Sequence, residues 1–290
     1  MGTMTKQALF SRAVLAYMSE VKGGNLKRFC EVMTQAGGET ITFNRIKPAS
    51  GNGTLVSMYS GDTANDVGNM EEVKATIGYI GEQQKVKDED MKKTTVDIKN
   101  VYVKSLSNGV ARKEDDAIID AIVAKTPTSG TSGGTKPDKV TITDYSSNAS
   151  VKLIIKEIRK AQALAGVTPD NHRGVALVMC AKDWAELATS DYALNNDFAV
   201  VYGGGKTGEA DRFFGAEVVL VTERQNKVGG TERFSYVIPS NTVCFGEWEN
   251  SVRADAEFHP TDKMQWHLQV VKSVGVAIAE PASITQLHTA

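Results

Sequence analysis

The chain has 290 residues, of which 41% are apolar and 23% charged, and its formal net charge at pH 7 is −2. This is the composition of an ordinary folded chain with room for about two domains, and a charge so close to zero excludes bulk attraction to nucleic acid or to an anionic membrane. The three cysteines are far apart and contain no CxxC pair, which predicts reduced core thiols and folding in the cytoplasm, and excludes a zinc or redox motif.

The first 50 residues predict a helix and a strand but no core of their own. The N-terminus lacks a signal-peptide profile, and residues 4–22 carry apolar side chains at helical spacing until Gly23 and Gly24 end the pattern. Residues 40–45 alternate apolar and polar side chains, as a half-buried strand does. So short a segment buries too little apolar surface to fold alone, so we expect it to be tied either to the main body or to another copy of the protein.

Residues 51–93 have a different character, rich in Gly, Asn, Asp and Ser and then in charged side chains. We expect residues 54–59 and 76–86 to form the two strands of a long projecting hairpin. Because a two-stranded ribbon is marginal by itself in water, the segment is either a floppy surface loop or a ribbon that lies on a neighbouring subunit.

Residues 94–125 predict a long helix around which the rest of the chain is organised. The phase of the apolar face slips across residues 107–109, which predicts one bent helix or two helices in series. Asp115 falls on the second apolar face, either as an edge residue that reaches water or as a partly buried acid with a basic partner. Pro127 ends the helix, because the residue before a proline is pushed out of the α region.

The middle of the chain predicts alternating helices and strands after a linker at residues 126–138. An apolar stripe at helical spacing predicts a helix over about 148–165, with Asn148 or Ser147 as its N-cap. A continuous apolar run at 174–181 predicts a buried strand. A brief helix at 182–187 and strands at 198–202 and 216–222 complete an α/β or α+β domain.

The end of the chain predicts strands at 234–238, 243–245 and 264–278. In the last of these, Trp266, Leu268 and Val270 alternate with polar residues, and the alternation shifts near Ser273, where a bulge is one explanation. We expect this strand to return beneath the long helix, so that both ends of the sequence build one domain.

The motifs of catalysis and cofactor binding are missing from the sequence. Residues 203–208, GGGKTG, resemble the end of a phosphate-binding loop, but Val200 stands where the first Gly is required. The four histidines show no metal-ligand spacing, there is no GxSxG, and the acidic clusters fit no calcium loop. No apolar run approaches the roughly 20 residues of a membrane span. The sequence therefore predicts a protein without catalytic, cofactor or metal sites, with an enzyme built on residues 203–206 as a distant alternative.

In order along the chain, these segments resemble the major capsid proteins of tailed bacteriophages with the HK97-type fold. ARKEDDAIIDAI in the long helix is the most family-like phrase, followed by KLIIKEIRKAQALAGV, GVALVMCAKDWAELATSDYALNNDF, FFGAEVVLVTER and the closing WHLQVVKSVGVAIAEPASITQL. The resemblance covers nearly the whole chain, and the linker at 126–143 departs from it in length and composition.

The resemblance implies an α+β fold divided into four parts. Residues 1–50 would be an N-terminal arm and 51–93 an extended E-loop hairpin. Residues 94–143 and 236–290 would form a peripheral domain with a long spine helix and closing strands, and residues 144–235 an axial domain.

The resemblance also implies the function and the partners. Copies would form pentamers and hexamers that close into an icosahedral head around double-stranded DNA, held non-specifically. A scaffolding protein and a portal would take part in assembly in the host cytoplasm, and no membrane would be involved. The alternative is an encapsulin-like shell of a bacterial nanocompartment, which encloses enzymes.

Candidate contacts between subunits are expected in the hairpin, the long helix and the Gly-rich loop. They are Asp62, Asp66, Lys85, Lys87, Asp115, Gly204, Lys206 and Arg212.

Overall fold

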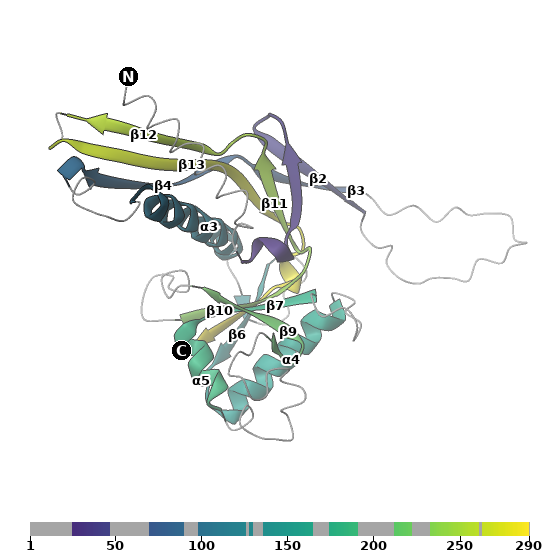
Figure 1. Cartoon of the computed structure of the whole chain (residues 1–290). Helices are drawn as coiled ribbons and strands as arrows, with labels where there is room; N and C mark the ends of the chain where they lie inside the picture. The colour runs from purple at the N-terminus through teal and green to yellow at the C-terminus, as the bar shows by residue number, and fades with distance from the viewer. Residues whose placement is uncertain are drawn as a thin grey trace, which may run out of the picture.

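The computed structural model describes residues 25–46, 70–89, 98–125, 128–129, 136–164, 174–190, 212–221, 233–260 and 263–289. The expected helix at 4–22, the expected strands at 54–59 and 198–202, and the loop at 203–211 lie outside these residues. The chain forms two units, each built on its own sheet (Figure 1). The mixture of helices and sheets confirms the α+β class predicted from the sequence.

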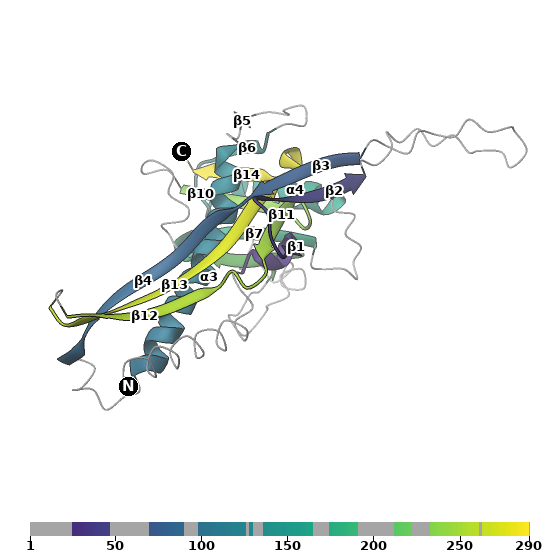
Figure 2. The same ribbon diagram turned by 90° about the horizontal axis from the view of Figure 1, so that it is seen from above.

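The upper unit is a five-stranded sheet with one long helix along it. Its strands are β1 (Glu31–Gln35), β4 (Gly78–Lys87), β11 (Val243–Trp248), β12 (Arg253–His259) and β13 (Gln265–Ile278). Strand β13 is the centre of this sheet and pairs antiparallel with β4, β11 and β12, whereas β1 runs parallel to β11 at the edge. Figure 2 shows β12, β13 and β4 running side by side along most of the unit.

Helix α3 (Ile98–Ala124) is one continuous helix of 27 residues. Of the two predictions for this segment, one helix or two helices in series, the single helix is the right one. Gly109 lies where the helix approaches β4, because a Cβ there would stand 2.9 Å from Glu82 Cγ. Val103, Leu106 and Val110 share a buried cluster with Leu268 and Val270 of β13. The expected return of the last long strand beneath the helix is therefore confirmed.

Strands β2 (Thr40–Ile46) and β3 (Met70–Thr76) form an antiparallel hairpin that leaves the upper unit (Figure 1). The prediction that residues 76–86 belong to the hairpin was wrong for 78–86, because β4 pairs with β13 along its whole length. The apolar side chains Ile80 and Val86 of β4 pack toward α3, so this strand is drawn into the core of the body. The first hairpin strand is instead the one expected at residues 40–45.

The lower unit is a seven-stranded sheet covered on one face by two helices. Its order is β5 (Thr128–Ser129), β6 (Asp138–Ile142), β14 (Thr285–Thr289), β10 (Arg233–Pro239), β7 (Val175–Cys180), β9 (Ala216–Val221) and β8 (Arg212–Phe213). Helices α4 (Asn148–Leu164) and α5 (Ala181–Ala188) pack on this sheet (Figure 1). Every residue of β7 is buried, as its continuous apolar run predicted.

Two parts of this sheet differ from the expected division of the chain. Residues 285–289, expected to lie with the long helix, form β14 between β10 and β6 of the lower sheet. The predicted linker contributes β5, and Asp138, at its end, begins β6. These strands follow Gly, Ser and Pro residues that suggested irregular chain, and their strand character comes from pairing with segments far away in sequence.

Helix α4 begins after Ser147, whose Oγ accepts a hydrogen bond from the backbone N–H of Ser150 at 3.3 Å. Of the two residues predicted as the N-cap, Ser147 is therefore the one that caps the helix. Short 3₁₀ turns occur at Lys27–Phe29 (η1) and Pro281–Ser283 (η4). Among the described residues, the helices are all too short or too polar to span a membrane.

Candidate functional site

The hairpin is attached to the body by a small apolar cluster at its base. Ile41, Phe43 and Ala75 of the hairpin are completely buried against Cys244 and Trp248 of β11. The indole Nε1 of Trp248 donates a hydrogen bond to the carbonyl oxygen of Gly38 at 2.8 Å, just before β2 begins. The base of the hairpin is thus fixed rigidly on the upper sheet.

Two glycines allow this close approach of the hairpin. A Cβ on Gly246 would stand 2.8 Å from Ile41 Cδ1, and a Cβ on Gly275 would stand 2.7 Å from the carbonyl oxygen of Thr76. Backbone cannot move away as easily as the end of a side chain, so Gly275 is the stricter requirement. The shift in alternation near Ser273 occurs here, because residues 272–275 are all buried, with α3 beneath them and the hairpin base beside them.

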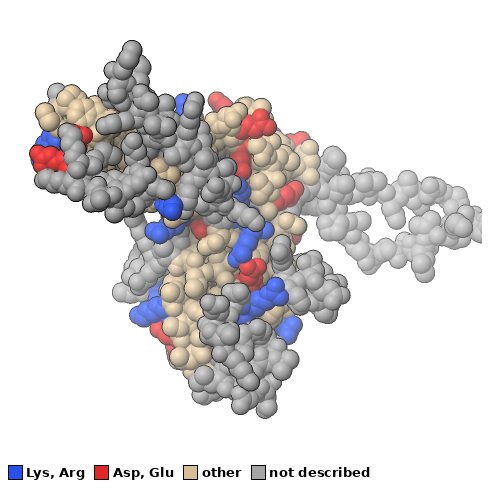
Figure 3. Space-filling view, viewed as in Figure 1, with Lys and Arg blue, Asp and Glu red and all other residues tan. Residues whose placement is uncertain are grey.

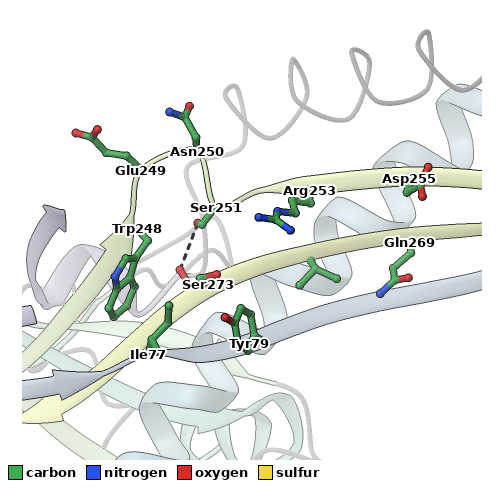
Figure 4. A pocket seen from close by; sticks show the side chains of 11 residues that line it. Ile77, Tyr79, Trp248, Glu249, Asn250, Ser251, Arg253, Asp255, Gln269 and Ser273 are labelled. Atoms are coloured by element: carbon green, nitrogen blue, oxygen red, sulfur yellow. Dashed lines mark hydrogen bonds between the residues drawn. The ribbon is translucent and has the colours of Figure 1, made fainter. Parts of the chain in front are cut away.

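A groove lies on the face of the upper sheet that points away from α3, next to the hairpin base (Figure 4). Its volume is about 510 Å³. Tyr79, 75% exposed, provides aromatic surface, the buried Trp248 forms part of the lining, and Arg253 and Asp255 of β12 provide charge. Ser251 Oγ donates to the carbonyl oxygen of Ser273 at 3.4 Å across the groove (Figure 4). Exposed aromatic surface beside charged groups is typical of a protein contact.

Behind the hairpin base, four charged side chains form a series of ion pairs of alternating sign, in which Glu114 and Lys272 are buried and Lys27 and Glu247 partly buried. Lys27 Nζ lies 2.5 Å from Glu247 Oε1, and Lys272 Nζ lies 2.6 Å from the same oxygen. Lys272 also bonds Glu114 of α3, which is 1% exposed. Burial acts to lower the pKa of Lys272, but Glu114 and Glu247 outweigh it and hold the pKa above its ordinary value. For Glu247, burial is likewise outweighed, by the two lysines, and its pKa is lowered.

Asp115 lies beside this series of ion pairs and is bonded to backbone, not to a base. Its Oδ1 accepts from the N–H of Leu26 at 2.9 Å, and its Oδ2 from the N–H of Asn25 at 3.1 Å. Burial raises the pKa of Asp115 to about 6, against the opposing effect of these hydrogen bonds. Of the two interpretations made from the sequence, the exposed one is wrong, and the buried one is right about burial but wrong about the partner.

The expected contact residues occupy different places. Lys85 and Lys87 are exposed on β4, and Arg212 is exposed on β8. Asp115 is inside the subunit, so it is not a surface contact. Asp62, Asp66, Gly204 and Lys206 lie outside the described residues.

The series of ion pairs formed by Lys27, Glu114, Glu247 and Lys272 was not predicted from the sequence. One signal was available for it. Lys272 continues the inward series of Trp266, Leu268 and Val270, and a lysine at an inward position of a strand requires a buried acidic partner. Within the described residues, no group of three or more His, Cys, Asp or Glu side chains is placed to hold a metal ion.

The same architecture occurs in proteins of known structure. Residues 4–289 match the family described as "Phage capsid protein". No curated protein matches the chain. The capsid of cyanophage P-SCSP1u superposes with a TM-score of 0.62 at 13% identity, over 93% of this chain and 89% of that one.

Two further solved structures have the same fold. The capsid of a native GTA particle gives a TM-score of 0.60 at 13% identity, over 91% of this chain and 89% of that one. A virus-like particle from Pyrococcus furiosus gives 0.58 at 12% identity, over 97% of this chain and 99% of that one. At these identities the likeness shows the fold alone.

Proposed function

The chain belongs to the phage capsid protein family, and we propose that it is the major capsid protein of a tailed bacteriophage, whose copies form pentamers and hexamers of an icosahedral head around double-stranded DNA. Its fold is the HK97-type capsid fold that the sequence resembled, and its place is the capsid of the virion. In this proposal the subunit is structural and performs no catalytic step.

The observation that carries the proposal is the β2–β3 hairpin, whose described residues pack on the body at its base. Ile41, Phe43 and Ala75 are buried there, and the hairpin then leads away from both sheets (Figures 1 and 2). Because a two-stranded ribbon is marginal alone, we infer that a neighbouring copy supplies the surface on which it rests. Obligate interfaces bury about 2,000–5,000 Å², and a subunit in a shell reaches that area by summing several neighbours.

The two sheet units suggest the two domains of such a subunit. We assign the peripheral role to the upper unit, with α3 as its spine helix, and the axial role to the lower unit. The boundaries follow the sheets, so β10 and β14 go with the axial unit. Exposed Arg212, at the end strand β8 of the axial sheet, and Lys85 and Lys87 on β4 remain our candidate contacts between copies.

The charge distribution supports enclosure of DNA without tight binding. The net charge is −2. On the face shown in Figure 3, Lys and Arg lie mostly on the lower unit and where the units join, whereas Asp and Glu gather on the upper unit near the hairpin. Tight phosphate binding requires clustered cations, so we propose only non-specific contact with DNA. A scaffolding protein and a portal during assembly in the host cytoplasm belong to the same proposal.

Electron microscopy of the purified full-length protein tests the proposal. We expect closed icosahedral particles with five- and six-fold capsomers. The matched variant replaces residues 47–69 by a short Gly–Ser linker and keeps β2, β3 and their buried base. It should keep the melting temperature of the subunit and lose closed particles. Normal particles from this variant, or a wild-type protein that stays monomeric under all assembly conditions, would contradict the proposal.

The virus-like particle from Pyrococcus furiosus favours a second candidate, because this chain matches almost its whole length. In that case the shell would be an encapsulin-like nanocompartment that encloses enzymes. Particles recovered from the native source and treated with nuclease decide between the two. Protected double-stranded DNA supports the phage head, and a protein cargo with no nucleic acid supports the nanocompartment.

A further inference from the structure

Residues 25–29 contact both sheet units at the place where they meet. Lys27 Nζ binds Glu247 Oε1 of the upper sheet at 2.5 Å. Arg28 binds Glu217 Oε1 on β9 of the lower sheet at 2.6 Å. The carbonyl oxygen of Phe29 accepts a hydrogen bond at 2.8 Å from the N–H of Asn241, in the turn between β10 and β11. Five consecutive residues thus connect strands that belong to different sheets.

The apolar side chains of this segment are buried in a core that both units share. Leu26 is 1% and Phe29 3% exposed. Their cluster includes α3 through Ile118, Ile119 and Ile122, the lower sheet through Val219, Val221 and Phe234, and the upper sheet through Phe245 and Val274. Removal of the segment would open this shared core, so its contribution is to the relative position of the units and not to either unit alone.

Asp115 holds the first two residues of the segment. It lies one turn before Ile118 and Ile119 on the same face of α3, and its two carboxylate oxygens accept the N–H groups of Asn25 and Leu26. We propose that residues 25–29 are a clamp between the two sheet units, and that Asp115 is the positioning residue that closes it and makes its closure depend on pH. The proposal goes beyond shell assembly and does not depend on it.

The direction of the pH dependence follows from burial. With the clamp closed, the pKa of Asp115 is raised to about 6, above its ordinary value of 3.8, with burial as the main cause. When the clamp opens, the carboxyl group meets water and its pKa falls toward the ordinary value. The closed state therefore binds the proton more tightly, and acidification toward pH 5 favours closure.

The other titratable groups near Asp115 either raise its pKa further or keep the same charge state over the pH range of the experiment. Glu114 and Asp116, its neighbours on α3, add to the raised pKa. Cys30, which follows the segment directly, has its pKa raised to about 12, chiefly by burial, and is neutral between pH 5 and 8. Lys27 of the segment, Lys272 of β13 and Glu247 of β11 form the adjoining series of ion pairs. The pKa of Lys272 is raised and that of Glu247 lowered, so these two groups stay charged between pH 5 and 8.

Hydrogen–deuterium exchange of the full-length protein tests the clamp. The quantity measured is the protection factor of the peptide that covers residues 25–30, at about pH 5.5 and about pH 7.5, each corrected with a free peptide of the same sequence. For a carboxyl group whose pKa moves from the ordinary value to about 6, linkage gives about fourfold more protection at the lower pH. Light scattering confirms that the assembly state is the same at both pH values.

Three variants separate the parts of the proposal. Asp115→Asn should abolish the fourfold ratio. Asp116→Asn, the same charge change one residue away, should keep most of it, because Asp116 makes the smallest contribution to the raised pKa of Asp115. Arg28→Ala, which removes the ion pair with Glu217 of the lower sheet and leaves Asp115 in place, should lower protection at both pH values and keep the ratio. A wild-type ratio of one, or a full ratio in Asp115→Asn, would overturn the proposal. If Asp115→Asn does not fold, the wild type and the other two variants still decide it.

Discussion

At the scale of single residues, the subunit depends on charges buried where β11, β13 and α3 meet. Lys272 is paired on both sides, with Glu114 and with Glu247. Breaking a buried pair by removing one partner leaves a charge without compensation, whereas an exposed pair contributes little. The pair between Lys113 and Glu82 is of the second kind, with side chains 43% and 39% exposed.

Lys272→Met should therefore destabilise the subunit by about 3–5 kcal/mol, because the buried Glu114 loses its ion pair with Lys272. Lys113→Met is the control and should change stability by no more than about 1 kcal/mol. Urea unfolding midpoints of the two variants provide the measurement. Equal effects of the two substitutions would show that the buried ion pairs contribute no more to the free energy of unfolding than the exposed pair.

Glu247 gives the subunit a second, separate dependence on pH. Its pKa in the folded chain lies below the ordinary value of 4.5. Its contribution to the free energy of unfolding is therefore complete above about pH 5, and it is lost as the pH falls through the lowered pKa of the folded chain. Glu247→Gln should be less stable than wild type at neutral pH, and the difference should shrink on acidification below pH 4.5. A difference that stays constant from pH 7 to pH 3 would contradict this assignment.

At the scale of elements, the attachment of the hairpin depends on Gly275. Gly275→Ala should destabilise the subunit by about 1–3 kcal/mol, because the new methyl group meets the backbone carbonyl of Thr76 at 2.7 Å. Gly246→Ala meets only the end of the Ile41 side chain and should cost less. Melting temperatures rank the two. The reverse order would place the tight contact at β2 and not at the junction of β3 with β13.

Elements with a strong local pattern could be predicted from the sequence, and those defined by distant partners could not. The apolar stripes of α3 and α4, the continuous run of β7 and the alternation of β13 identified these elements. Strands β5, β6 and β14 carry little pattern of their own and exist because they pair with each other and with β10. The strand at 78–87 was predicted, but only the structure shows that it pairs with β13.

The same limit applies to the site. Asp115 stood out as an acid on an apolar face, but the sequence cannot show that its partners are two backbone N–H groups 89 and 90 residues earlier. Lys85, Lys87 and Arg212 were expected at the surface and are exposed. Their contact with other copies stays a prediction.

At the scale of the whole molecule, β14 holds the lower unit together. It lies between β10 and β6, and Leu287 is completely buried in the core beneath α4. Deletion of residues 285–290 should separate β5 and β6 from the rest of the sheet and prevent cooperative unfolding of that unit. Calorimetry should show a single broad or missing transition for the truncated chain, against a sharp one for wild type. A truncated chain that melts as sharply as wild type would show that the sheet closes without this strand.

The position of β14 also sets the order of events during synthesis. A ribosome delivers chains from the N-terminus, and domains usually fold as they emerge. Here β14, an interior strand of the lower sheet, follows β11, β12 and β13, which belong to the other unit. The lower sheet must therefore wait, with one edge of β6 and one edge of β10 unpaired, until the upper unit has been translated. Non-local pairing of this kind folds slowly, so the nascent subunit stays incompetent to join its neighbours until β14 has been translated.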